Sequence, residues 1–127
     1  MSFMQFLTGK KKILIVEDDA TLRRTLADKF KTAGFRVLEA GDAQQVLVMM
    51  SVERPDALVL DLILPIKDGL SLLSELRGTG YTQPVVILTN LLGSEDLRAD
   101  ATRLDAIFFN KSSTTLDEIV EAVRAHL

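Results

Sequence analysis

The chain of 127 residues contains no cysteine and only one histidine. The absence of cysteine excludes both a disulfide scaffold and a thiolate metal site, and a single histidine cannot form an imidazole cluster. Any metal ion bound by side chains of this protein would therefore have to sit on oxygen ligands.

Long apolar runs and an excess of basic charge are also missing. No run approaches the ~18 apolar residues of a membrane span, and the positive charges of residues 1–12 follow the apolar pairs, unlike those of a signal peptide. We therefore predict a cytoplasmic protein that does not enter a membrane. With a net charge of −3 and a pI near 5.1, we expect this chain alone not to bind nucleic acid, which requires a basic face.

Apolar side chains are plentiful enough for one core. Hydrophobic residues make up 47% of the chain and charged residues 26%, which is the composition of a folded domain. The length suits a single domain. We predict an N-terminal tail at 1–11 and one domain over 12–127.

Short β-branched runs alternate with segments of helical periodicity. The predicted strands are 13–16, 35–40, 57–60, 85–88 and 107–109. The predicted helices are 20–33, 43–54, about 70–77, 94–104 and 115–127, the last opening with a Thr115–Glu118 capping box. Parallel strands need crossover connections, so this alternation predicts an α/β fold, a parallel sheet with helices on both faces.

Polar residues end four of these strands. Glu17 and Asp18 follow the first strand, Asp61 the third, Thr89 the fourth and Lys111 the fifth. The carboxyl ends of parallel strands form one edge, where doubly wound sheets bind ligands. Three carboxylates together require a cation, and oxygen ligands suit Mg²⁺. The hydroxyl and the ammonium can hold phosphoryl oxygens, which leaves Asp61 as the nucleophile.

A family resemblance rests on motifs in this order along the chain. The motifs are Ile13-Leu-Ile-Val-Glu-Asp-Asp19, Leu58-Val-Leu-Asp61-Leu-Ile-Leu-Pro65, Asp68-Gly69, Val86-Ile-Leu-Thr89 and Phe108-Phe-Asn-Lys111. Together they resemble the receiver domain of two-component response regulators over residues 11–127. The resemblance implies a doubly wound, flavodoxin-like (βα)5 fold whose five-stranded parallel sheet has the order 2-1-3-4-5.

The resemblance also implies a role for each acid. Asp61 would accept a phosphoryl group from a phosphohistidine of a sensor histidine kinase or a histidine phosphotransfer protein. Glu17, Asp18, Asp61 and the backbone carbonyl of Ile63 would bind Mg²⁺. The domain would be a signalling switch rather than an enzyme, although it would assist its own phosphorylation and dephosphorylation.

The remaining implied residues transmit the switch. Thr89 would hydrogen-bond the phosphoryl group, Phe108 would turn inward, and Lys111 would pair with the phosphate. The adjacent Phe109 could share the role of Phe108, and an aromatic residue in a strand is more often simple core. The changes would alter the surface of the fourth helix, fifth strand and fifth helix, where a partner or a second copy would bind.

Four positions depart from the family pattern. Asn90 stands where a small residue is usual, and we expect it to narrow the approach of a phosphodonor. Ser112 follows Lys111 where proline is usual, so we expect either a trans bond with a shifted loop or a strained cis bond costing ~3 kcal/mol. Ile63 and Leu91 are apolar at positions that modulate hydrolysis, which predicts slow self-dephosphorylation.

The same residues bear on three rival functions. An aspartate-nucleophile phosphatase would carry a second acid where Ile63 stands. A flavodoxin-like electron carrier would not place Glu17, Asp18 and Asp19 in its phosphate loop. A degenerate receiver that only binds partners stays open, and so does the choice between a stand-alone receiver and part of a longer regulator.

Overall fold

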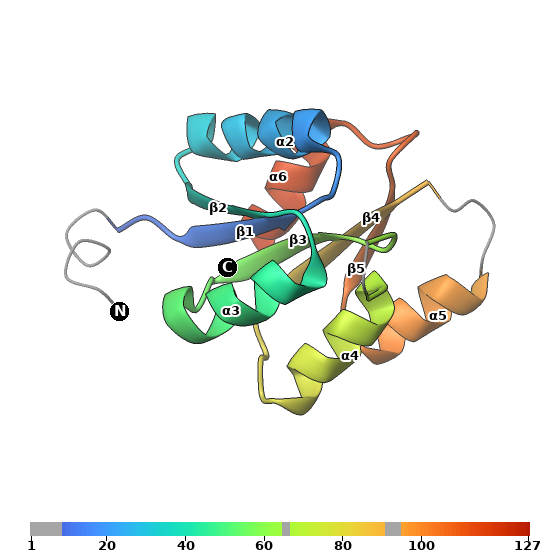
Figure 1. Ribbon diagram of the computed structural model, residues 1–127. Coiled ribbons are helices and arrows are strands. Elements are labelled where there is room, and N and C mark those ends of the chain that lie inside the picture. Colours follow the sequence, from blue (N-terminus) through green and yellow to red (C-terminus); the bar gives the residue numbers. More distant parts are fainter. Residues whose placement is uncertain (1–8, 65–66, 91–94) are drawn as a thin grey trace.

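The structure, a computed structural model, describes residues 9–64, 67–90 and 95–127. Strands and helices alternate along them (Figure 1). The strands are β1 (Lys12–Val16), β2 (Arg36–Ala40), β3 (Ala57–Asp61), β4 (Val85–Thr89) and β5 (Ile107–Asn110). The helices are α2 (Ala20–Thr32), α3 (Ala43–Glu53), α4 (Gly69–Gly78), α5 (Glu95–Arg103) and α6 (Leu116–Ala125). Each element lies within a few residues of its predicted position.

Some predictions concern residues outside these ranges. The predicted tail at 1–11 falls mostly outside the described residues, as do Pro65 and Leu91. Strand β1 begins at Lys12, the predicted start of the domain. Among the helices that the structure describes, none has the length and apolar character needed to cross a membrane.

The five strands form one sheet in the order β2-β1-β3-β4-β5, and every neighbouring pair is parallel. This confirms the predicted order. Val16 pairs with Leu60 across β1 and β3, and Thr89 pairs with Asn110 across β4 and β5. The carboxyl ends of the three central strands and β5 therefore meet at one edge.

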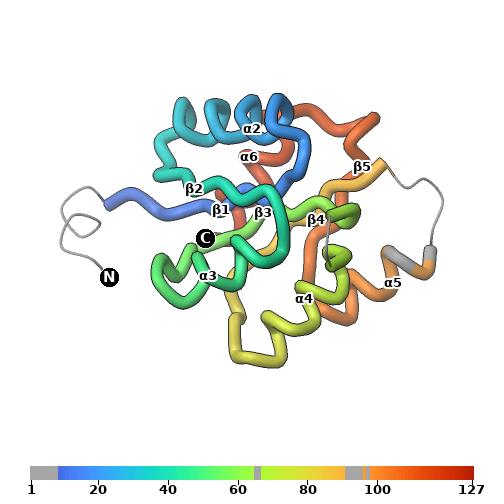
Figure 2. Tube along the Cα trace, viewed as in Figure 1, coloured from blue at the N-terminus to red at the C-terminus, as the bar shows by residue number. Residues whose placement is uncertain are grey.

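Helices cover both faces of the sheet (Figures 1 and 2). Alternate side chains of β1 show the two layers, because Leu14 packs in a cluster with residues of α3, α4 and α5, whereas Ile13 packs in a cluster with residues of α2 and α6. Burial on both faces explains why the strands are continuous apolar runs rather than alternating ones. The apolar clusters on the two faces hold the strand ends in place.

Side-chain caps set where the helices begin. Asp19, Asp42 and Asp68 are the N-caps of α2, α3 and α4, and each carboxylate accepts backbone N–H groups of the first turn. The predicted capping box of Thr115 and Glu118 is present at the start of α6. Such caps satisfy N–H groups that have no partner inside the helix. Because each helix follows a strand, the caps lie at the carboxyl edge of the sheet.

Candidate functional site

The carboxyl edge of the sheet brings the predicted acids together. Asp61 is the last residue of β3, and Glu17 follows Val16, which pairs with the residue before Asp61. Carboxylate oxygens of Glu17, Asp18 and Asp61 lie within 4.8 Å of one another. Glu17 and Asp61 are buried and Asp18 is exposed. This acidic cluster can hold a metal ion, as the sequence predicted.

The third acid of the Glu-Asp-Asp run has a different role. The Asp19 carboxylate accepts the backbone N–H groups of Thr21 and Leu22, at 3.0 and 3.1 Å, and so caps α2. Its own N–H donates to Glu17 Oε1 at 3.2 Å. Asp19 therefore holds the start of the helix against the acidic cluster. In the sequence, an Asp placed directly before a helix is the signal for this role. The signal is easily overlooked when the three acids are considered only as one motif.

Lys111 reaches both buried acids of the cluster. Its Nζ donates to Glu17 Oε2 and to Asp61 Oδ2, each at 2.8 Å. The lysine side chain is only 16% exposed, against 4% for Glu17 and 8% for Asp61. A buried pair of carboxylates needs such compensation, because an unpaired buried charge is strongly destabilising. The Lys111 ammonium thus supplies positive charge to both buried carboxylates.

Burial and mutual contact shift the protonation of these groups. Burial, with a further contribution from the neighbouring Asp61, raises the pKa of Glu17 to about 7 against the opposing effect of Lys111. Burial by itself lowers the pKa of Lys111, but its hydrogen bonds to Asp61 and Glu17 outweigh this and raise it. Lys111 is therefore charged at neutral pH. Glu17 can therefore gain or lose a proton near pH 7.

A close backbone contact fixes the position of Asp61. Gly69 N donates to Leu62 O at 2.8 Å, and a Cβ on Gly69 would lie 2.5 Å from Asp61 O. Only glycine permits this approach of the start of α4 to the end of β3. The backbone N–H of Ile63 also donates to Asp61 Oδ1 at 3.1 Å. The Asp68-Gly69 motif thus packs the start of α4 against the backbone that carries Asp61, as well as capping a helix.

The predicted hydroxyl lies at the neighbouring strand end. Thr89 is the last residue of β4, is fully buried, and its carbonyl accepts the N–H of Lys111 at 3.0 Å. The structure therefore brings Glu17, Asp18, Asp61, Thr89 and Lys111 to one edge, as predicted. Ile63, whose carbonyl was predicted as a metal ligand, follows Asp61 with a side chain that is 56% exposed.

The two phenylalanines of β5 face opposite layers. Phe108 packs against the cluster that contains α3, α4 and α5 residues, and Phe109 packs against the cluster of α2 and α6. The Arg98 guanidinium lies over the Phe108 ring, 5.1 Å from its centroid. Phe108 is thus half-buried under an α5 side chain, whereas Phe109 belongs to the other face.

Two of the four residues that depart from the family pattern, Asn90 and Ser112, contact each other. Ser112 Oγ donates to Asn90 Oδ1 at 3.1 Å. Among the described residues every peptide bond is trans, including that between Lys111 and Ser112. The sequence pointed to each residue separately but did not predict their hydrogen bond, because they lie on loops after different strands.

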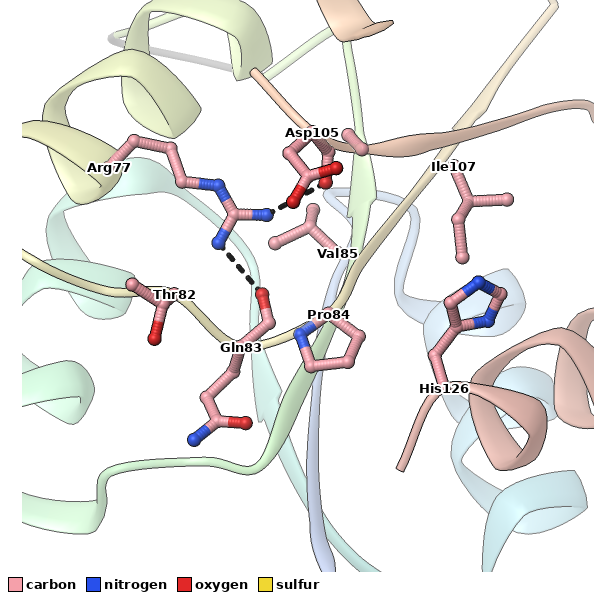
Figure 3. A pocket seen from close by; sticks show the side chains of 9 residues that line it. Arg77, Thr82, Gln83, Pro84, Val85, Asp105, Ile107 and His126 are labelled. Carbon is pink, nitrogen blue, oxygen red and sulfur yellow. Dashed lines mark hydrogen bonds between the residues drawn. The ribbon is translucent and has the colours of Figure 1, made fainter. Parts of the chain in front are cut away.

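Another hollow of the surface lies at the opposite edge of the sheet. Figure 3 shows this pocket, which is lined by residues that precede or begin β4 and β5, together with Arg77 and His126. It contains none of the predicted site residues. His126 is exposed. The acidic cluster at the carboxyl edge is therefore the candidate site.

Comparison with known proteins agrees with this geometry. A model of the response regulator receiver domain matches residues 13–124. Response regulator MprA of Mycobacterium tuberculosis is 42% identical over 78 residues, which are 61% of this chain and 34% of that protein. The chain thus spans about a third of the length of this curated relative.

Solved structures show the same fold. The receiver domain of Francisella response regulator 1452 has a TM-score of 0.84 and 26% identity, covering 91% of this chain and 95% of that one. The beryllofluoride-activated N-terminal receiver domain of Klebsiella pneumoniae RstA has a TM-score of 0.82 and 28% identity, covering 91% and 97%. The chain belongs to the response regulator receiver domains, a family whose known function is to accept a phosphoryl group in two-component signalling.

Proposed function

We propose that Asp61 is the phosphoacceptor of this domain and that its donor is a phosphohistidine of a sensor histidine kinase or a histidine phosphotransfer protein. The observation that carries the proposal is the position of Asp61: it is buried at a strand end, grouped with two other acids, and held by Lys111. A carboxylate nucleophile forms an aspartyl phosphate as the bond between phosphorus and the donor nitrogen breaks.

The acidic cluster suits Mg²⁺, because hard oxygen ligands without imidazole or thiolate favour such an ion. Glu17, Asp18 and Asp61 would hold it, with the Ile63 carbonyl as a further ligand. When bound, the ion would neutralise charge on the transferring phosphoryl group.

The protein's own residues orient the acceptor. Ile63 N–H holds Asp61 Oδ1 and the Lys111 ammonium holds Oδ2, so the nucleophile is positioned before a donor arrives. Once Asp61 carries phosphate, Lys111 would pair with a phosphoryl oxygen, and the Thr89 hydroxyl would donate to another. Each contact places a positive charge or a hydrogen-bond donor beside the phosphoryl oxygens, where negative charge accumulates.

The proposed output is a change of surface. Movement of Thr89 and Phe108 would alter α5, β5 and α6, the fourth helix, fifth strand and fifth helix of the domain, where a partner or a second copy would bind. We propose that the domain at 12–127 acts in this way as a cytoplasmic switch, assisting its own phosphorylation and dephosphorylation rather than turning over a substrate. No nucleic acid or membrane contact by this chain is part of the proposal.

The test is incubation with Mg²⁺ and either acetyl phosphate or a cognate phosphorylated kinase, read by mass spectrometry, with beryllofluoride binding measured in parallel. Asp61→Asn should abolish the mass gain of about 80 Da that one phosphate adds. Asp28 is an exposed acid on α2, and Asp28→Asn should leave the mass gain unchanged. A protein that neither gains mass from any donor nor binds beryllofluoride would be a degenerate receiver, and the proposal would be wrong.

A further inference from the structure

A hydrogen bond joins the two loops that leave β4 and β5. Asn90 is the first residue after β4, and its Oδ1 accepts the Ser112 hydroxyl at 3.1 Å. The Ser112 backbone is itself fixed, because its N–H donates to Asn110 Oδ1 at 2.8 Å. Both side chains are exposed. We call the Asn90–Ser112 contact the loop bridge.

The register of the sheet places the loop bridge beside the site. Thr89 pairs with Asn110, and Lys111 N donates to Thr89 O at 3.0 Å. Asn90 and Ser112 each come one residue after this last backbone bond. The loop bridge therefore lies just outside Thr89 and Lys111, on the carboxyl side of the sheet.

A phosphodonor must approach Asp61 from that same side. Helices cover both faces of the sheet, and Asp61 is buried at the carboxyl end of β3. In phosphoryl transfer the attacking and leaving atoms lie roughly in line on opposite sides of phosphorus. The leaving group of the donor therefore points away from Asp61, outward toward the rim that the loop bridge closes between β4 and β5.

We propose that the loop bridge is a specificity determinant of this receiver, which restricts small phosphodonors according to the size of their leaving group. The inference rests on the proposed function of Asp61. Asn90 and Ser112 are not among the hydrogen-bond partners found for Asp61 in the described part of the chain, and the loop bridge acts by limiting the space for the leaving group. A donor that releases ammonia needs less room at the rim than one that releases acetate.

The experiment compares phosphoramidate with acetyl phosphate on the parent chain, four single variants and one double variant. Asn90→Ala and Ser112→Ala each break the loop bridge, and Ser112→Thr retains the hydroxyl. Ser113→Ala is the matched control, because Ser113 is the adjacent exposed serine and its N–H donates to a backbone carbonyl. Phosphorylation rates are measured by mass spectrometry, beryllofluoride affinity by titration, and folding by thermal unfolding.

Breaking the loop bridge should raise the rate with acetyl phosphate about threefold to tenfold, since one such hydrogen bond is worth roughly a factor of five. The rate with phosphoramidate should rise less, so the ratio of the two rates should increase. Beryllofluoride has no leaving group, and its affinity should stay within about twofold by the same reasoning. Ser112→Thr and Ser113→Ala should match the parent chain. The Asn90→Ala/Ser112→Ala double variant should match Asn90→Ala, because the bond is already absent.

Two results would overturn the inference while the proposed function stands. One is an unchanged ratio of the two donor rates in variants that are phosphorylated and folded. The other is an equal rise in both rates and in beryllofluoride affinity, which would show that the residues act on the pocket itself. If the parent chain accepts phosphate from no donor and binds no beryllofluoride, the proposed function and this inference are both wrong.

Discussion

Two cationic side chains lie at opposite edges of the sheet and are held in different ways. Lys111, at the carboxyl edge, is held by the carboxylates of Glu17 and Asp61. Arg77, at the amino edge, donates to four backbone carbonyls at 2.7–3.1 Å, two of which are drawn in Figure 3. These carbonyls belong to Leu104, Tyr81, Gln83 and Asp105.

The difference is that Lys111 can be replaced as the partner of its carboxylates, whereas Arg77 is a permanent partner of its carbonyls. The two carboxylates around Lys111 carry charge that a divalent cation or a phosphoryl group can engage instead. The carbonyls around Arg77 are backbone groups without net charge, and their place is set by the chain itself. A cation held by charged side chains can take part in a reaction, and a cation held by backbone carbonyls stabilises the fold.

The largest expected effect concerns the carboxyl edge. Lys111→Met should slow phosphorylation by about 100-fold or more, because one preorganised charge at the reacting group is removed. Mg²⁺ should bind more tightly, since the ammonium no longer occupies the acidic cluster. Rates with phosphoramidate and Mg²⁺ titrations measure both. Lys29→Met, on α2, serves as control, and an unchanged phosphorylation rate in Lys111→Met would contradict the comparison.

The amino edge should respond in the opposite way. Arg77→Met should lower the free energy of unfolding by about 2–4 kcal/mol, because four backbone carbonyls lose their donor. The phosphorylation rate per folded molecule should stay the same. Chemical denaturation and phosphorylation of the folded fraction test this, with Arg103→Met on α5 as control. A loss of phosphorylation without a loss of stability would show that the two edges are not separate.

Glu17 provides a pH test of the carboxyl edge. The folded protein keeps the Glu17 proton up to about pH 7, whereas an unperturbed glutamate loses it near 4.5. The folded state therefore binds more protons between these values, and stability falls as pH rises through them. Glu17→Gln removes this dependence, so its stability relative to the parent chain should rise by about 3 kcal/mol from pH 4.5 to 8.

Denaturation without divalent ions at several pH values measures this effect. Glu121→Gln, an exposed acid on α6, should follow the parent chain at every pH. A Glu17→Gln variant whose stability changes with pH in parallel with the parent chain would show that Glu17 is not the group that titrates.

The smallest expected effect is at the rim of the site. The Ile63 side chain is exposed beside Asp61 and has no polar group to orient an attacking water, so the aspartyl phosphate should decay slowly. Ile63→Asn should speed the decay by about threefold to tenfold by positioning water. The decay is followed by mass spectrometry after removal of the donor, with Val48→Asn on α3 as control. A lifetime of seconds in the parent chain would contradict the prediction.

Particular residues show how far sequence reasoning reached. Asp61, Thr89 and Lys111 could be assigned to one edge because each ends a strand of a parallel sheet, and the structure confirms their placement. The cap formed by Asp19 was not predicted, although Asp19 directly precedes the predicted helix, because the acidic run was interpreted only as part of the family motif. The four backbone contacts of Arg77 were not predicted either, because carbonyl partners leave no trace in side-chain patterns.

The sequence by itself determined the fold class, the strand order expected of the family and the acids at the strand ends. The fold class and the strand-end acids followed from periodicity and strand termination, which are local properties of the chain, and the strand order followed from the resemblance to the receiver family. Only the tertiary structure decided which of these groups meet. Lys111 contacts acids that are 94 and 50 residues away in the chain, and Phe108 and Phe109 divide between two layers. Such contacts depend on how strands are packed side by side, which no local pattern encodes.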